Sequence, residues 1–316
     1  YANNKTRQKL LSLSDARQRA KRVTTPAPKP KQLGLQQLEV PLDALLDTID
    51  WAPFFHAWEF KGTFPALLDD ANQGEAARSL WADGQALLKE ILAKGALQAK
   101  ASFALWPARG EGETIIVDGP EGEERFEFLR QQRGKSPACL ADFVADNNDH
   151  LGLFWVTAGH GLDEIVQGFE AQDDTYSALL AKALADRFAE SLAEWLHKKV
   201  RLETWGFLPN ETLTSDELFA ERYQGIRPAP GYPACPDHRH KQVIHRLLKA
   251  AEIGAELTES CAMTPAASVA GFYLAAPEAH YFSISQIDEE QLDDLAGRRG
   301  DSREESQRWL SPLLLA

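Results

Sequence analysis

The segment RPAPGYPACPDHRH, residues 227–240, concentrates residues that could bind a ligand. Proline fixes φ and pushes the residue before it towards extended backbone, so a stiff, extended loop is predicted. Arg227 offers a planar, permanently charged fork that suits a carboxylate, and Gly231 permits a close backbone approach. These features predict a preformed groove for a small, carboxylate-bearing molecule, with a merely structural loop as the alternative.

Two other kinds of chemistry are conceivable in the same segment. Cys235 and His238 supply a thiolate and an imidazole, but structural zinc usually takes four ligands in two close pairs, and no second pair is visible. Cys139 and Cys235 lack the sequence context of a catalytic nucleophile, so we interpret them as buried, inert thiols. We therefore expect no metal site, and keep a zinc enzyme built on Cys235 and His238 as a lesser hypothesis.

Carboxylates elsewhere in the chain could face a cationic ligand. Asp186 and Glu190 are four residues apart in a predicted helix, so they share a face opposite its apolar stripe. Glu194 and His197 are expected to extend this solvated surface. Asp50 starts an aromatic-rich run and is interpreted either as a helix cap or as a carboxylate at the rim of an aromatic pocket.

A nucleotide site of the Rossmann type is not expected. The glycine pairs in RGEGET (109–114) and GHGLDE (159–164) both lack the third glycine of a dinucleotide-binding turn. Two glycines at a strand-to-helix connection usually form only a turn.

The elements that must position these residues follow one another irregularly. Helices are predicted over 66–95, 171–201, 217–223 and 240–254 and near 291–300. Strands are predicted over 101–108, 113–119, 124–130, 151–159, 267–276 and 280–287, with 151–159 central and the last two paired around Pro277. Because strands and helices do not alternate regularly as βαβ units, this order predicts an α+β fold with a mainly antiparallel sheet and packed helices.

Charge is distributed unevenly along the 316 residues. Residues 1–31 hold nine Lys or Arg and one acid, while the whole chain has a formal net charge of −13, which leaves −21 on the remainder. Such an acidic body repels phosphate backbones, so no nucleic-acid partner is expected. No run of about 18 apolar residues is present, so no membrane partner is expected.

The N-terminal region is predicted to be distinct from the body. Residues 1–22 are interpreted as a basic helix, and Pro26, Pro28 and Pro30 predict an extended connection after it. We therefore divide the chain into an arm and linker over 1–34 and a compact domain over 35–316. Three widely spaced cysteines and no signal segment indicate a reducing compartment, and we expect a cytoplasmic location.

The loop, with its flanks, also resembles a known family. RYQGIRPAPGYPACPDH (222–238) is similar to the signature of the C-terminal activation domain of cobalamin-dependent methionine synthase. The resemblance continues in order through most of the chain, in IDWAPFFHAWEFKGTFP (49–65), CLADFVA (139–145), KALADRFAESLAEWLHKKVR (182–201), LTESCAMTPAASVAGFY (257–273) and RWLSP (308–312).

This resemblance implies a C-shaped single domain that binds S-adenosylmethionine. It implies that the ligand is presented for reductive methylation of cob(II)alamin, with an electron from flavodoxin or a related flavoprotein reductase. Reactivation would serve the full-length methyltransferase, which moves a methyl group from methyltetrahydrofolate to homocysteine. Cobalamin would be bound by the preceding domain of the same polypeptide, which the 1–34 arm would join, and zinc by a more N-terminal part.

The resemblance also assigns roles to individual residues. It places Asp50 near the ligand's α-amino group and Arg227 on its carboxylate. It places Ala229 and the segment from Tyr232 to Ala234 beside the adenine and ribose. The remaining matched positions are an aromatic pair, Tyr281 and Phe282, and three acids near the junction of ligand and cobalamin, Asp186, Glu190 and Glu221. No catalytic residue is expected in this fragment, which should not make methionine alone.

A second hypothesis needs no ligand. In it the acidic body docks the cobalamin domain and a flavodoxin-like reductase, and the proline-rich loop is only structural.

Overall fold

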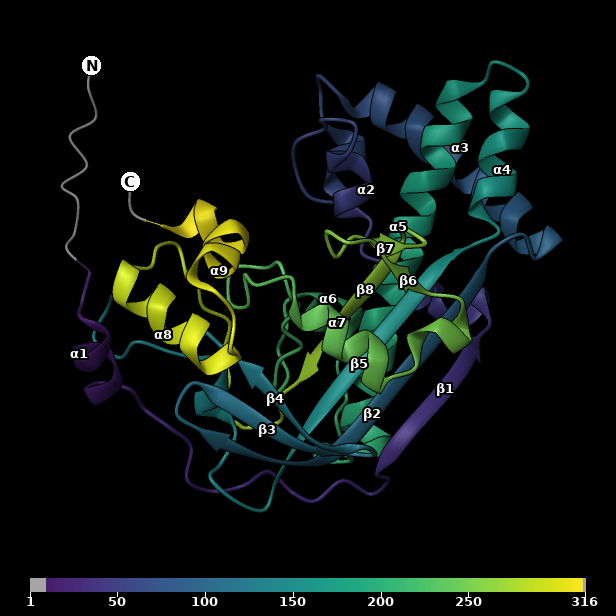
Figure 1. Ribbon diagram of the computed structural model, residues 1–316. Helices are drawn as coiled ribbons and strands as arrows, with labels where there is room; N and C mark the ends of the chain where they lie inside the picture. Colours follow the sequence, from purple (N-terminus) through teal and green to yellow (C-terminus); the bar gives the residue numbers. More distant parts are fainter. Residues whose placement is uncertain (1–9, 315–316) are drawn as a thin grey trace, which may run out of the picture.

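An antiparallel sheet forms the centre of the protein. The computed structural model describes residues 10–314. Its main sheet has the strand order β4-β3-β2-β5-β8, and β1 pairs with the first half of β2 (Figure 1). The strands are β1 (Gly34–Val40), β2 (Gln98–Glu111), β3 (Thr114–Gly119), β4 (Gly122–Glu127), β5 (Asp149–His160) and β8 (Ser268–Tyr273), and β6 (Glu256–Leu257) pairs separately with β7 (Met263–Thr264).

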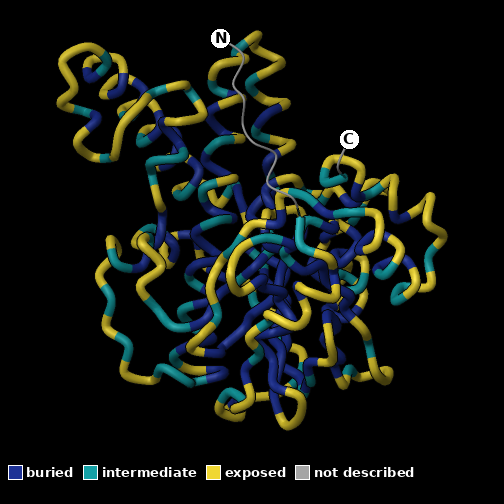
Figure 2. Tube along the Cα trace, turned by 90° about the vertical axis from the view of Figure 1, so that its left-hand side faces the viewer, coloured by how far each residue is buried: buried dark blue, intermediate teal, exposed yellow. Residues whose placement is uncertain are grey.

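The strand β5 is central, as its apolar sequence predicts. It lies between β2 and β8, and every residue from Asp149 to Gly159 is buried. Because side chains alternate across a strand, Phe154 and Val156 join one apolar cluster while Leu153 and Trp155 join another on the opposite face. Figure 2 shows this buried layer at the middle of the molecule, with exposed segments around it.

Helices cover both faces of the sheet and extend beyond its ends. The long helix α5 packs on one face of β5, and α7 packs against β5 and β8. Helices α2, α3 and α4 gather at one end and α8 and α9 at the other, which gives the ribbon an open, C-like outline (Figure 1). The helices are α1 (Leu13–Gln18), α2 (Ala52–His56), α3 (Gly74–Lys94), α4 (Leu162–Glu170), α5 (Thr175–Lys199), α6 (Ser215–Phe219), α7 (His240–Leu247), α8 (Glu289–Arg299) and α9 (Arg303–Leu310).

This arrangement confirms the predicted α+β fold with an antiparallel sheet and flanking helices. Gly95 ends α3 in the left-handed conformation, with φ of 58°, as the sequence predicts. Within residues 10–314, no helix combines the length and apolar character needed to cross a membrane.

The prediction that Glu194 and His197 lie on a solvated helix face is wrong. They are only 4% and 1% exposed, although the apolar stripe of α5 is buried as predicted. Residues beyond α6 also pack against this end of α5, where Tyr223 contacts the side chains of both Glu194 and His197. Helical periodicity identifies one buried face, but it cannot show that a distant loop covers part of the other.

The predicted basic helix over 1–22 is also wrong in extent. Within the described residues it is limited to α1, and residues 1–9 lie outside the described part. The chain that follows, over residues 20–33, has no helix or strand, and it lies on the body. Val23 donates a backbone hydrogen bond to Asp142, at 2.9 Å, and the Trp205 indole donates one to the Pro28 carbonyl, at 2.7 Å. Arg17 of the arm pairs with acids of the body, Glu113 at 2.8 Å and Asp294 at 2.7 Å.

The predicted strand over 280–287 does not form. The free edge of β8 and its extension is occupied instead by the segment before the proline-rich loop. Ile226 and Leu274 exchange backbone hydrogen bonds of 2.9 and 3.0 Å, and Phe272 donates one to the carbonyl of Pro228. Residues 280–286 therefore form an irregular segment, which meets the loop through a hydrogen bond from Ile284 to the Pro233 carbonyl.

Candidate functional site

The proline-rich loop is fixed by the edge of the sheet. Pro228 accepts the bond from Phe272 but has no N–H to return, so regular pairing stops there. Opposite it, Gly271 makes the close approach possible, because a Cβ at this position would lie 2.4 Å from the Pro228 carbonyl oxygen. The loop that starts at Arg227 therefore leaves the sheet edge at a defined place.

The tip of the loop is a tight turn around Gly231. The Gly231 N–H bonds to the Cys235 carbonyl, at 2.7 Å, and the φ of 99° suits glycine. The His238 ring packs where a side chain would stand, since a Cβ on Gly231 would come within 2.2 Å of it. Tyr232, at 57% exposed, projects from this turn.

Cys235 and His238 are arranged as parts of the loop's scaffold. Cys235 is fully buried, and burial raises the pKa of its thiol. The His238 Nδ1 lies 3.1 Å from the Lys241 ammonium. Across residues 10–314 no three His, Cys, Asp or Glu side chains form a group that could hold a metal ion. The geometry thus gives the zinc-enzyme hypothesis no support.

Two adjoining pockets open beside the loop. The first, which we call the apolar pocket, has a volume of about 370 Å³. It is lined by Phe154, Glu190, Glu221, Arg227, Pro228, Ala229, Tyr232, Pro233, Ala234, Val269, Tyr281 and Phe282. Aromatic and aliphatic walls with a few charged groups are typical of small-molecule sites.

The second, which we call the acidic pocket, has a volume of about 350 Å³. It is lined by Thr48, Asp50, Pro53, Arg187, Glu190, Ser191, Glu194, Phe219, Glu221, Arg227 and Tyr232. Four residues are common to both pockets, namely Glu190, Glu221, Arg227 and Tyr232. The two pockets are therefore parts of one elongated depression, with an apolar end and an acidic end.

The depression brings together nine of the ten site residues expected from the sequence. Asp50 lies at the acidic end, where its carboxylate also accepts a hydrogen bond of 3.0 Å from the Ala52 N–H at the start of α2. This position fits the interpretation of Asp50 as a rim carboxylate, whereas the N-cap of α2 is Trp51 and receives no side-chain cap. Asp186 is the exception, because it is exposed on α5 one turn before Glu190 and lines neither pocket.

Arg227 is already engaged by protein groups on one side. Its Nη1 lies 2.6 Å from a Glu194 carboxylate oxygen and donates to the Tyr223 hydroxyl, at 2.5 Å. Its backbone N–H donates to the Tyr281 hydroxyl, at 3.1 Å. Burial by itself would lower the pKa of the guanidinium, but Glu194 and neighbouring groups outweigh it and raise that pKa. Arg227 is therefore a fixed cation between the two ends of the depression.

Sequence reasoning missed the contributions of Glu194 and Tyr223. Glu194 lines the acidic pocket and is bound to Arg227, whereas the sequence placed it on a solvated surface. A signal was present, because Glu194 is one helical turn after Glu190 and shares its face. Tyr223 carried no such signal, since its position depends on the path of the chain after α6.

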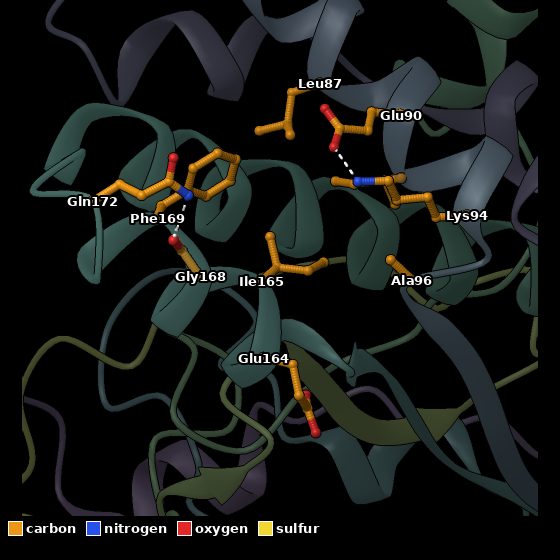
Figure 3. Close-up of a pocket in the computed structure, with 10 residues that line it drawn as sticks. Leu87, Glu90, Lys94, Ala96, Glu164, Ile165, Gly168, Phe169 and Gln172 are labelled. Carbon is orange, nitrogen blue, oxygen red and sulfur yellow. Dashed lines mark hydrogen bonds and ion pairs between the residues drawn. The ribbon is translucent and has the colours of Figure 1, made fainter.

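A further groove lies between α3 and α4, and it offers fewer polar groups to a ligand than the depression beside the loop. Its volume is about 250 Å³, and its walls include Leu87, Ile165 and Phe169 (Figure 3). Some of its polar groups already have partners, since Lys94 pairs with Glu90 and the Gln172 amide donates to the Gly168 carbonyl. We assign no ligand to this groove.

Comparison with known proteins agrees with the geometry. The family model described as "Vitamin B12 dependent methionine synthase, activation domain" matches residues 41–300. Among solved structures, the crystal structure of the MetH reactivation domain bound to AdoHcy is 40% identical in sequence and superposes with a TM-score of 0.93. This match covers 97% of the present chain and 99% of the other. The chain thus belongs to the activation-domain family of vitamin B12-dependent methionine synthase, an enzyme.

Proposed function

We propose that this domain binds S-adenosylmethionine in the elongated depression and presents it for reductive methylation of cob(II)alamin. The observation that carries the proposal is the placement of Arg227 at the meeting point of an apolar and an acidic pocket. S-adenosylmethionine has the matching layout, with an adenosine at one end and a cationic amino acid portion at the other. The likeness to a reactivation domain bound to AdoHcy supports the same ligand class.

Each part of the ligand has a chemically suitable neighbour. The carboxylate would pair with Arg227, and Asp50 in the acidic pocket would accept from the α-amino group. The adenine and ribose would lie along Ala229 to Ala234, facing Tyr281 and Phe282 in the apolar pocket.

The sulfonium would lie near Glu190 and Glu221, which line both pockets. Opposite charges in a partly desolvated site attract more strongly than in water, so these two acids would favour a cationic ligand. We place Asp186 further out on the same face of α5, towards the junction with cobalamin.

Membership of the family supports a proposal for the wider role. Cobalamin, held by the preceding domain of the same polypeptide, would accept the methyl group after a one-electron reduction supplied by flavodoxin or a related flavoprotein reductase. Residues 1–34 would lead from that domain, and 35–316 would form the activation domain. The three free, buried cysteines fit a reducing, cytoplasmic setting. By itself the domain would bind the ligand without making methionine.

Isothermal titration calorimetry of the purified domain with S-adenosylmethionine and with S-adenosylhomocysteine tests the proposal. We expect saturable binding at one site per chain, and ligand density beside Arg227 in a co-crystal. Absence of binding at millimolar ligand, together with measurable docking to an isolated cobalamin domain, would instead favour a pure interaction module.

A further inference from the structure

Arg227 is held by two side chains that come from different parts of the chain. Glu194 projects from the last turns of α5, and its side chain is 6% exposed. Tyr223 follows α6, and its hydroxyl lies 2.5 Å from the Arg227 Nη1 and 3.4 Å from the Glu194 carboxylate. The hydroxyl can accept from the guanidinium and donate to the carboxylate at the same time. All three groups thus form one closed hydrogen-bonded triangle, two of whose members, Glu194 and Arg227, line the acidic pocket.

We infer that Glu194 and Tyr223 are positioning residues, which hold the Nη1 side of Arg227 so that its opposite N–H edge faces a ligand carboxylate. This inference rests on the proposed function. Within residues 10–314, both protein acceptors of the guanidinium lie on Nη1, which leaves Nε and Nη2 for a ligand. A guanidinium that is already oriented loses less conformational entropy on binding.

A second arginine fixes the orientation of Tyr223. The guanidinium of Arg201 lies 3.8 Å from the centre of the Tyr223 ring, and Arg201 is fully buried. Its Nε and Nη2 bind the two carboxylate oxygens of Glu211, at 2.9 and 2.8 Å. The bidentate pair restrains the arginine, and the stacked arginine restrains the ring. Tyr223 is therefore a fixed support for Arg227.

The test compares two ligands that differ only in the carboxylate. Affinities for S-adenosylmethionine and for its decarboxylated analogue are measured by calorimetry on Tyr223→Phe, which keeps the ring stacked on Arg201. We expect S-adenosylmethionine to bind about fivefold to tenfold more weakly, as for loss of one coupled contact, and the decarboxylated analogue to change by less than about twofold. A general structural loss would weaken both ligands alike.

Glu194→Gln is the second variant, and it should reduce the preference for the carboxylate-bearing ligand at least as much. Tyr176→Phe and Glu203→Gln are matched controls, because they remove a tyrosine–carboxylate bond to Asp83 and an ion pair with Lys199 outside both pockets. Thermal unfolding confirms that each variant is folded. If Glu194→Gln does not fold, Tyr223→Phe still tests the positioning role. This variant removes only one hydroxyl and is therefore expected to fold.

The outcomes separate this inference from the proposed function. If wild type fails to bind S-adenosylmethionine, both are overturned. If wild type binds and Arg227→Ala abolishes the preference for the carboxylate, the proposed function stands. In that case, three results in the Tyr223 and Glu194 variants would overturn the positioning role alone. These results are equal changes in affinity for both ligands, no change in affinity, and tighter binding of S-adenosylmethionine.

Discussion

Replacement of Arg227 gives the sharpest prediction for ligand binding. Its side chain is 18% exposed, so a bound carboxylate would meet a largely desolvated guanidinium. Truncation of one partner in such a pair costs about 2–5 kcal/mol, and the residual solvent contact favours the lower part of that range. For Arg227→Ala we expect a loss of about 2–4 kcal/mol in binding free energy. This loss corresponds to a dissociation constant for S-adenosylmethionine that is about 30-fold to 700-fold larger.

The same change removes the cation that balances Glu194. Arg201 Nη1, at 3.8 Å from the other carboxylate oxygen, would be the remaining positive neighbour. Loss of one partner from a buried ion pair costs about 3–5 kcal/mol of stability, so Arg227→Ala should also unfold more easily. Arg227→Lys separates the two effects, because it retains a charge for Glu194 but lacks the second N–H edge that a ligand carboxylate needs.

Calorimetry gives the affinities, and urea unfolding gives the stabilities. Arg246→Ala is the matched control, since Arg246 pairs with Glu124 at 2.8 Å on the surface and lines neither pocket. We expect weak binding in both Arg227 variants, reduced stability mainly in Arg227→Ala, and near-normal binding in the control. A folded Arg227→Ala domain with wild-type affinity for S-adenosylmethionine would refute the assignment of the carboxylate to this residue.

Two further predictions concern charge elsewhere. The double variant Glu190→Gln, Glu221→Gln should lower the ratio of affinities for S-adenosylmethionine over S-adenosylhomocysteine by about tenfold, because only the former carries a sulfonium charge. An unchanged ratio in competition calorimetry would remove these acids from the sulfonium site. Burial among Phe126, Phe128 and Phe272 lowers the pKa of His240 to about 4. The folded pKa lies below the unfolded value of about 6.5, so this contribution to stability is complete above pH 6.5 and is lost as the pH falls towards 4. Between pH 7 and pH 5, urea unfolding should show wild type losing about 2 kcal/mol more than His240→Phe. Equal losses would show that His240 does not titrate in this way, and His56→Phe, at an exposed position, is the control.

Several features of the fold were predictable because they depend on local pattern. The run 151–159 is apolar except for Thr157, so it is expected to be covered on both faces, and it forms the core of β5. The apolar stripe of the long helix and the glycine that ends α3 follow from helical geometry in the same way. β1 was missed, because its alternation of exposed and half-buried residues gives only a weak signal.

Strand pairing and burial at the site depended on contacts between distant segments. The edge beside β8 was taken by Ile226 rather than by 280–287, and a sequence pattern cannot show which segment reaches an edge first. The segment before β1 was predicted to be a basic helix followed by an extended connection, but only acceptors and acids of the body place it on the surface.

For the site, the sequence alone predicted that the segment after Arg227 is stiff and offered Arg227 as its candidate anion-binding group, because proline geometry and guanidinium charge are properties of the residues themselves. Only the tertiary structure decided that Glu194 and Tyr223 meet Arg227, and that Asp50 and Glu221 line the same pocket as Glu194. These four residues come from three parts of the chain, because Asp50 precedes α2, Glu194 lies on α5, and Glu221 and Tyr223 follow α6. Their distances are set by how α5, α6 and β8 pack together, and no local pattern of residues encodes that packing.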